Sequence, residues 1–346
     1  MIFSFLENKF LVIDFGSVNI KVIEAIKKGS TIEVTNFGIV PIINFKEVIS
    51  SSYILEENIA LILKNFLQET NIKTKQVYFS VPSPYIFSTN FIVPNIPERN
   101  LPQVITFESQ KQLPLSVSDI EIEYRYFLSQ GEDQANQWLI FLVATPKSYI
   151  KKLENICNFT QLKFAGYGAE YFNVESFFKD KPGNFVVIDI GHAYGNICLI
   201  KNGKINYANK LKIRAYDYLN SIMNATQYPE SQVLDFVAKK GFAFNPEEKD
   251  LKNLANVFLD SVASTVQSEI TRLETSFLAR VDKIYWTGGA VILDNFFDEM
   301  LKRLLRYQQE ILTPANFVYG DKFKMLKEKS TLFTQVTGLL LKKIIG

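Results

Sequence analysis

The sequence contains very little histidine and cysteine. His192 is the only histidine among 346 residues, and Cys157 and Cys198 are the only cysteines. Histidine-rich metal sites are therefore excluded, and a Ser-His-Asp triad could be built only around His192. Two cysteines without a Cys-x-x-Cys spacing cannot form a disulfide framework, which favours a reducing compartment. We expect His192 to lie in a loop at the rim of a cleft and both cysteines to be small core residues.

Net charge and long apolar runs are also missing. The 38 Lys and Arg residues nearly balance the 36 Asp and Glu residues, so the surface supplies no field that would hold a nucleic acid or an anionic membrane. No segment reaches the roughly 18–20 consecutive apolar residues of a membrane span, and the N-terminus lacks the pattern of a signal peptide. We therefore expect a cytoplasmic protein without direct membrane insertion, peripheral to the inner membrane only through a partner.

Two segments about 175 residues apart repeat one pattern, an apolar strand that ends in Asp-x-Gly and leads into a hairpin. The first is FLVIDFG, with Asp14 and Gly16, and the second is FVVIDIG, with Asp189 and Gly191. This recurrence predicts two homologous halves. Between them, residues 84–164 follow the order strand, helix, strand, strand, helix, which is typical of a small inserted α+β module.

Three turns could face a phosphate or a nucleotide. Gly16 and Ser17 follow Asp14 in a tight hairpin, and Lys21 is spaced so that its ammonium can return to the same anion. Asp189 and Gly191 repeat this geometry without a lysine. In WTGGAV, Gly288 and Gly289 end a strand and open a helix, so the backbone can approach a ligand closely. Each turn alone is a weak signal, because Asp-x-Gly after an apolar strand is often a simple hairpin.

Together, in this order, the turns resemble the actin-like ATPase superfamily. The position of the insert and the stretches FLVIDFGSVNIKVIE, IPERNLPQVITFESQKQLP, EITRLETSF and IYWTGGAVILDNF resemble the PilM family of type IV pilus assembly proteins. The resemblance covers essentially the whole chain. It implies an α/β fold of the actin or RNase H type, with two domains around a nucleotide cleft and an inserted α+β subdomain. The implied first domain is 1–83 plus 165–182, the insert 84–164, and the second domain 183–346, with a helical subdomain at about 215–280 and a closing C-terminal helix.

The resemblance also implies ATP and Mg²⁺ as cofactors and assigns their contacts. The phosphate group is Asp14, Gly16, Ser17, Lys21, Asp189, Ile190 and Gly191; the ribose and base group is Glu269 and Arg272; the adenosine group is Gly288, Gly289 and Ala290. Asp14 and Asp189 would hold the metal through water, which Mg²⁺ usually retains. Glu170 matches the position where the superfamily keeps a water-orienting polar residue, the catalytic role. Its alternative is a solvated carboxylate on a helix surface.

Two departures from the family pattern concern the nucleotide. The second hairpin continues as His192-Ala193-Tyr194-Gly195, without the Ser or Thr that meets the γ-phosphate in the family. Arg214 and Ala215 stand where the family has a Gly-Gly turn, which adds bulk near the ligand, although Arg214 could pair with a phosphate. We therefore expect ATP binding with weak or absent hydrolysis.

The function implied by the resemblance is that of an ATP-binding scaffold of type IV pilus assembly. It would bind the N-terminal cytoplasmic peptide of a PilN-like inner-membrane protein in a groove between the insert and the first domain, and link it to the pilus motor ATPases. Self-association into an oligomer or filament is compatible with the superfamily, and no nucleic acid partner is expected. The alternatives are a filament-forming cell-division or cytoskeletal ATPase like FtsA and the cytoplasmic component of a type II secretion platform.

Overall fold

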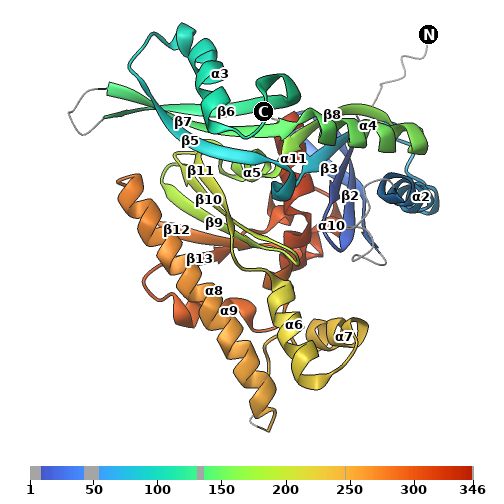
Figure 1. The fold of residues 1–346 in the computed structure, drawn as a ribbon. Coiled ribbons are helices and arrows are strands. Elements are labelled where there is room, and N and C mark those ends of the chain that lie inside the picture. Colours follow the sequence, from blue (N-terminus) through green and yellow to red (C-terminus); the bar gives the residue numbers. More distant parts are fainter. Residues whose placement is uncertain (1–8, 43–53, 131–135, 246, 345–346) are drawn as a thin grey trace.

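Two five-stranded sheets with the same strand order form the centre of the molecule. The computed structural model describes residues 9–42, 54–130, 136–245 and 247–344 (Figure 1). The first sheet has the order β3-β2-β1-β4-β8 and the second β11-β10-β9-β12-β13. In each, the first three strands of the half form antiparallel hairpins and the last two join in parallel. The shared order confirms the prediction of two related halves.

The strands lie close to where alternating and apolar runs predict them. The first sheet contains β1 (Lys9–Phe15), β2 (Asn19–Lys28), β3 (Thr31–Pro41), β4 (Gln76–Val81) and β8 (Lys163–Ala169). The second contains β9 (Asn184–Ile190), β10 (Gly195–Lys201), β11 (Lys204–Leu211), β12 (Lys283–Thr287) and β13 (Gln308–Ile311). Asn202 and Gly203 turn β10 into β11 with positive φ at both residues, as an Asn-Gly hairpin requires.

Both faces of the second sheet are buried. Val186 and Ile188 of β9 pack into one apolar cluster with the helices within residues 215–303. Phe185 and Val187 pack into another cluster, which also includes side chains of the first sheet. The two-residue period of a strand sends alternate side chains to opposite faces, so one strand serves two cores. Cys157 and Cys198 are buried, as the sequence predicts.

Two short helices are enclosed by the largest cluster. They are α5 (Glu170–Glu175), which is followed by η4 (Ser176–Phe178), and the C-terminal α11 (Thr334–Ile344). Their side chains join those of both sheets in one apolar core. Gly338 of α11 lies so close to α5 that a Cβ there would overlap the backbone carbonyl of Asn173. The two helices therefore contact each other backbone to backbone.

The inserted segment forms a three-stranded sheet of order β5-β7-β6, drawn at the top of Figure 1. Its strands are β5 (Phe87–Pro94), β6 (Ile120–Gln130) and β7 (Asn136–Pro146), and α3 (Leu101–Gln112) covers one face. Along β7, Ile140 and Leu142 belong to the core of the insert, whereas Phe141 and Val143 pack into the main core. The insert is therefore a thin layer that shares its middle strand with the rest of the molecule.

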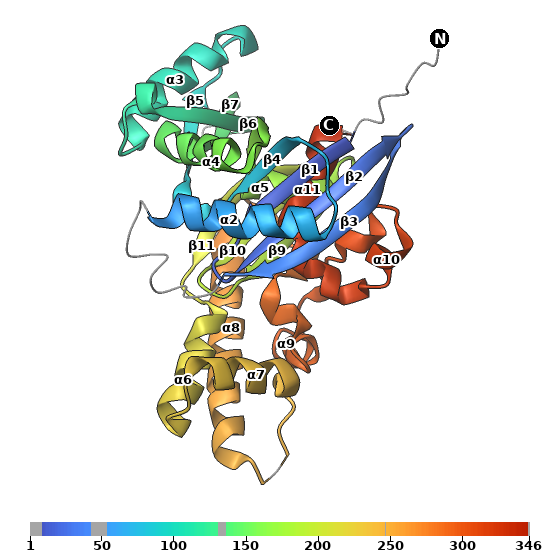
Figure 2. The same ribbon diagram turned by 90° about the vertical axis from the view of Figure 1, so that its right-hand side faces the viewer.

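Helix α4 (Lys147–Thr160) lies in the predicted insert but packs on the first half. Leu153, Ile156 and Cys157 of α4 belong to the main core, where α4 lies beside α2 (Ile54–Glu69), as Figure 2 shows. The predicted boundary at residue 164 thus includes a helix whose buried side chains support the first sheet. The domain boundaries given above stay predictions.

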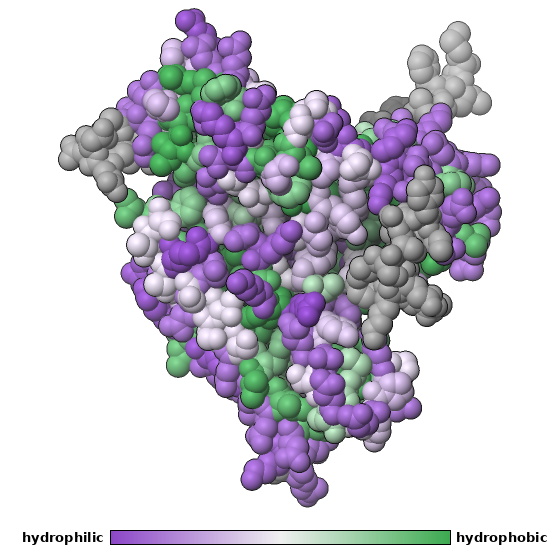
Figure 3. All heavy atoms as spheres, viewed as in Figure 1, coloured by the Kyte–Doolittle hydropathy of each residue, from purple (hydrophilic) through white to green (hydrophobic). Residues whose placement is uncertain are grey.

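The remaining helices cover the outer face of the second sheet. They are α6 (Ala215–Thr226), α7 (Glu230–Lys240), α8 (Lys249–Ser276) and α9 (Phe296–Arg303). The short α10 (Asp321–Lys324) instead packs through Phe323 into the main core, against Phe37 of β3. On the face drawn in Figure 3, apolar residues form small separate groups among polar ones. Within the described ranges, every helix is too short or too polar to cross a membrane.

Candidate functional site

The first Asp-x-Gly hairpin places a carboxylate and an ammonium side by side. Asp14 of β1 and Lys21 of β2 are direct cross-strand partners, and Lys21 Nζ lies 3.1 Å from Asp14 Oδ2. Gly16 closes the turn by donating its N–H to the carbonyl of Asn19 at 3.0 Å. A Cβ at Gly16 would overlap the ammonium of Lys21, so the glycine leaves room for this cation. Asp14 is buried and Lys21 is partly exposed, toward the pocket that both residues line.

The second hairpin repeats this backbone with different side chains. Asp189 of β9 pairs with Asn196 of β10 at the register position that Asp14 and Lys21 occupy in the first hairpin. Gly191 donates its N–H to the carbonyl of Tyr194 at 3.0 Å, which closes the turn. Beside it, Gly288 has φ +89°, and a Cβ there would overlap the Asp189 carboxylate. Only glycine permits this close approach of β12 to β9.

Glu170 joins the second hairpin to the segment that follows β4. It begins α5 with an exposed fraction of 2%, and its Oε1 accepts hydrogen bonds from Ser83 N at 2.6 Å and Asn196 Nδ2 at 2.8 Å. Burial raises the pKa of Glu170, hydrogen bonds from Ser83 lower it, and the carboxylates of Asp189 and Asp14 raise it, so that the pKa lies at about 8. The alternative of a solvated surface carboxylate is therefore wrong, because α5 is enclosed in the core and not on the surface.

Asp189 is the other carboxylate with a shifted pKa. Burial raises it to about 6; Gln335 and Lys21 act in the opposite direction, and Asp14 adds to the rise. Gln335 Nε2 donates to Asp189 Oδ2 at 3.3 Å from the first turn of α11. Gln335 also lines the pocket, together with Thr331, Leu332 and Thr334. The predicted site omitted these C-terminal residues, because only the folded chain brings α11 to the hairpins.

The pocket between the hairpins holds more carboxylates than cations. It is a cavity of about 120 Å³ lined by Asp14, Asp189, Glu170 and Lys21 and by the glycines of the three turns. The carboxylates of Asp14 and Asp189 face the single ammonium of Lys21, and a divalent cation would relieve their mutual repulsion. In the described part of the chain no three acidic, His or Cys side chains are close enough to hold a metal directly. The residues therefore fit a hydrated Mg²⁺ held by Asp14 and Asp189 through water.

The structure brings most of the predicted site residues together. The pocket lining includes these, listed in chain order: Asp14, Gly16, Ser17, Lys21, Glu170, Asp189, Gly191, Gly288 and Gly289. Ile190 and Ala290 flank the turns but are fully buried in the core of the second half. They support the turns from behind.

Glu269 and Arg272 are not brought to this pocket. Arg272 Nη2 donates to Tyr207 Oη at 2.6 Å and pairs with Glu269 Oε2 at 2.7 Å. The reason is the length of α8, whose 28 residues span about 42 Å and carry this pair along β11 toward the insert. The pair therefore lies outside the lining of this pocket, and its contact with a ribose and base stays a prediction.

The two departures from the family pattern have clear positions. Arg214 pairs with Asp217 at 2.8 Å and is absent from the pocket lining, so its bulk does not fill the pocket. His192 lines the rim beside Tyr216, and burial lowers its pKa. Tyr194 lies in the wall that the pocket shares with a second cavity.

This second cavity is apolar and larger, about 290 Å³. It lies between α2 and α4, with Ile59, Tyr149 and Leu153 in its lining and Tyr194 on the side of the first pocket. Tyr85 of η1 (Ser83–Tyr85) stacks on Tyr149 with ring centroids 4.3 Å apart and is 44% exposed at the edge. An apolar groove with exposed aromatic edges suits a peptide with apolar anchors.

Comparisons with solved structures identify the fold. A PilM–PilN type IV pilus biogenesis complex matches with a TM-score of 0.81 and 14% identity over 97% of this chain and 98% of that chain. The ethanolamine utilization protein EutJ from Carboxydothermus hydrogenoformans gives 0.56 and 13% over 96% and 88%. MreB5 of Spiroplasma citri bound to ADP gives 0.53 and 10% over 97% of both chains. The fold is that of the actin-like ATPases, as predicted.

No curated protein matches the chain in sequence. A family model does, and it covers almost every described residue. Residues 12–344 match the family described as type IV pilus assembly protein PilM, which includes both Asp-x-Gly hairpins, the insert and α11. The chain therefore belongs to the PilM family of type IV pilus assembly proteins.

Proposed function

We propose that this protein binds ATP with Mg²⁺ between its two Asp-x-Gly hairpins and acts as a scaffold in type IV pilus assembly. The observation that carries the nucleotide part is the pocket in which Asp14, Asp189 and Glu170 face Lys21 beside three glycine turns. Lys21 and the backbone N–H groups of the turns would meet phosphates, and Asp14 and Asp189 would hold the hydrated metal. A bound Mg²⁺ would neutralise phosphate charge.

Hydrolysis is weak or absent in this proposal. A water attacking the γ-phosphate needs an oriented hydroxyl or base. Glu170 is the residue placed to orient that water, but its Oε1 already accepts two hydrogen bonds and its raised pKa keeps it protonated near neutral pH. The small hydroxyl residue of the family is replaced by Tyr194-Gly195. Nucleotide therefore serves mainly as a structural ligand.

The partner is a PilN-like inner-membrane protein whose N-terminal cytoplasmic peptide binds this chain. Two observations support it: the family membership, and the likeness to the PilM of a PilM–PilN complex. The apolar cavity between α2 and α4 is the groove that we assign to the peptide, with Tyr85, Tyr149 and Leu153 as its contacts. The scaffold would place the protein at the inner membrane and connect the partner to the motor ATPases, with self-association as a further property.

Thermal unfolding with and without Mg-ATP tests the nucleotide part. Ligand at about 100 times its Kd adds roughly 2.7 kcal/mol to the free energy of unfolding. Asp14→Asn should remove this gain, whereas the exposed Asp235→Asn should keep it. Equal melting of the wild-type protein with and without millimolar Mg-ATP would reject nucleotide binding.

Calorimetric titration with a synthetic peptide tests the partner. The peptide is the N-terminal cytoplasmic segment of the proposed PilN-like partner, and we expect micromolar affinity because the peptide becomes ordered on binding. Tyr85→Ser should weaken it about tenfold, as aromatic anchors do. Tyr228→Ser, at a tyrosine that is 55% exposed and does not line the cavity, is the control. Unchanged affinity in Tyr85→Ser would move the peptide to another surface.

A further inference from the structure

Two helices run from the nucleotide pocket to the inserted sheet. Helix α5 begins with Glu170 in the pocket and ends with Glu175, which binds Arg125 of the insert. Helix α11 has Gln335 in the pocket and Lys342, two turns later, beside the insert. With a rise of about 1.5 Å per residue, these links span roughly 7 and 10 Å. Each helix therefore has one end at the pocket and the other end at the inserted sheet.

The link through α5 is made of directional contacts at both ends. In the pocket, Glu170 accepts from Ser83 N and Asn196 Nδ2 at 2.6 and 2.8 Å. At the other end, Glu175 accepts from Arg125 Nε at 3.0 Å for both oxygens and from Arg125 Nη2 at 2.5 Å. Such a two-pronged pair fixes orientation as well as distance. Glu175 also accepts from the backbone N–H of Ile205 at 3.0 Å, so it ties β11 to the insert.

The link through α11 has the same form. Gln335 Nε2 donates to Asp189, and Lys342 Nζ pairs with Glu123 of β6. Residues seven apart lie on the same face of a helix. The side chain of Lys342 is only 20% exposed, and burial lowers its pKa. The pair is therefore shielded from solvent and is screened little by salt.

The two helices are fastened to each other. The close approach of Gly338 to the carbonyl of Asn173 leaves no space for a side chain between them. Phe172 of α5 is fully buried, with the guanidinium of Arg125 4.5 Å and the ammonium of Lys342 5.1 Å from its ring centroid. Tightly packed elements shift as units because their packing does not deform continuously. We therefore treat α5 and α11 as one rigid pair.

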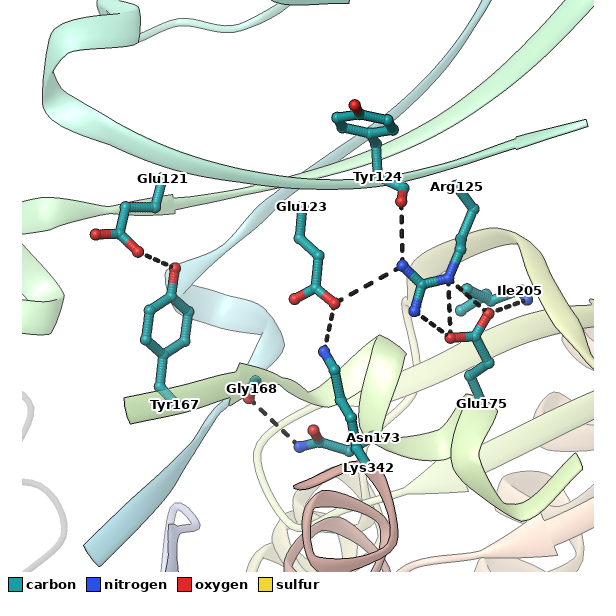
Figure 4. Close-up of polar contacts among 10 residues, drawn as sticks. All are labelled: Glu121, Glu123, Tyr124, Arg125, Tyr167, Gly168, Asn173, Glu175, Ile205 and Lys342. Carbon is teal, nitrogen blue, oxygen red and sulfur yellow. Dashed lines mark hydrogen bonds and ion pairs between the residues drawn. The ribbon is translucent and has the colours of Figure 1, made fainter. Parts of the chain in front are cut away.

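The insert meets this pair through charges. On β6, the alternate residues Glu123 and Arg125 point toward Lys342 and Glu175 of the central helices, as Figure 4 shows. Glu121 accepts a hydrogen bond from Tyr167 of β8 at 2.8 Å. Arg125 also lies 3.8 Å from Glu123. The charges of Lys342, Glu123, Arg125 and Glu175 therefore alternate in sign and sum to zero. A side chain in an ion pair or hydrogen bond can exchange one partner for another, whereas an apolar contact has no such distinct alternatives.

We propose that the α5–α11 pair couples the nucleotide pocket to the docking of the inserted sheet. The proposal rests on the proposed function, because the ligand that moves the pair is Mg-ATP. Phosphates and a metal entering the pocket change the contacts of Glu170 and Gln335, and the rigid pair carries that change to Glu175 and Lys342. The insert then shifts against the helices through its β6 ion pairs. Coupling of this kind is reciprocal, so a peptide that alters the position of the insert changes nucleotide affinity by the same factor.

Hydrogen exchange of the full chain, with and without saturating Mg-ATP, tests the coupling. We expect Mg-ATP to change the exchange rate of amides in residues 120–128 about fivefold, the lower range of allosteric factors. Glu175→Gln and Lys342→Met should each abolish that change while Mg-ATP still stabilises the pocket. Lys283→Met is the matched control, since it removes the Lys283–Glu310 pair of 2.8 Å between β12 and β13, which involves neither α5, α11 nor the insert. It should leave the response of residues 120–128 intact.

Failure of the coupling and failure of nucleotide binding give different results. Mg-ATP that raises the melting temperature without changing exchange in residues 120–128 would overturn the coupling alone. No stabilisation by Mg-ATP would reject the proposed function, and Gln335→Ala without nucleotide then decides the coupling. This variant removes the donor to Asp189 and should change exchange in residues 120–128 in the wild-type background but not in Lys342→Met. Equal exchange in all of these proteins would overturn the proposal.

Discussion

Asn196 donates a hydrogen bond to Glu170, at 2.8 Å, from the register position that Lys21 occupies in the first hairpin. The two halves thus use the same backbone for different tasks. The first hairpin aims a cation at the pocket, and the second holds a carboxylate in place with a neutral amide. This asymmetry gives the pocket one side suited to phosphate and one suited to water and metal.

Turnover of ATP should be very slow. We expect phosphate release below about 1 s⁻¹ at saturating Mg-ATP, under the range of typical kinases. The reason is that this chain lacks the small hydroxyl side chain that meets the γ-phosphate in the family. Glu170→Ala should lower the residual rate without weakening binding, as a water-positioning residue does. A wild-type rate of tens per second that Glu170→Ala abolishes would contradict this reading of Tyr194-Gly195.

Glu170→Gln should stabilise the empty protein at alkaline pH. The folded pKa of about 8 lies above the ordinary 4.5, so folding favours the protonated acid and loses stability as pH rises from 4.5 to 8. Glutamine is neutral throughout. In urea unfolding with EDTA, the variant should gain about 2–3 kcal/mol over the wild type at pH 8 and nothing at pH 4. A gain that is the same at both pH values would show that the carboxylate is not the cause.

Glu24→Gln should have the opposite pH dependence. Glu24 is buried; burial raises its pKa, but hydrogen bonds from Thr74, Asn36 and Thr35 and the charge of Lys9 outweigh burial and lower it below 4.5. The ionised Glu24 adds to the free energy of unfolding above pH 4.5, and this contribution is lost as pH falls through the folded pKa.

The variant should therefore lose about 1–2 kcal/mol at pH 7 and progressively less below pH 4.5, measured by urea unfolding. Glu33→Gln, which removes an exposed partner of Lys28, is the control and should change stability by under about 0.5 kcal/mol. Equal losses for Glu24→Gln at pH 7 and pH 3 would contradict the assignment.

Gly338→Ala should destabilise the contact between α5 and α11. The added methyl would overlap the carbonyl of Asn173, and overpacking of this kind costs about 1–3 kcal/mol. Gly289→Ala is the matched control, because the nearest atom to its Cβ would be 4.0 Å away. Chemical unfolding should show the loss for Gly338→Ala only. Equal stability of both variants would mean that the helices separate easily, which also weakens the proposed coupling.

Local patterns predicted a large part of this fold. The hairpins after Asp14 and Asp189 join strands that are neighbours in sequence, so alternation and turn residues suffice to set their pairing. The spacing of Lys21 from Asp14 followed from the same local geometry. The helices α3 and α4 were predicted from the element order of residues 84–164.

Several features were decided only when distant segments met. Glu170 is buried because α5 lies in the main core. Helix α4 packs on the first half because its apolar face meets α2. Gln335 reaches Asp189 across 146 positions of sequence. Glu269 and Arg272 lie far from the pocket because the long α8 carries them toward the insert. Each depends on how whole elements pack, for which a local pattern contains no information.

The sequence by itself determined the two related halves, their hairpins and the family. The hairpins come from periodicity and turn chemistry over fewer than about ten residues each, whereas the family came from the resemblance of longer stretches of sequence. The tertiary structure decided which carboxylates share one pocket, which helix links that pocket to the insert, and which predicted contacts lie elsewhere. The physical reason is that burial and charge proximity depend on every element that packs around a side chain, and those neighbours come from opposite ends of the chain.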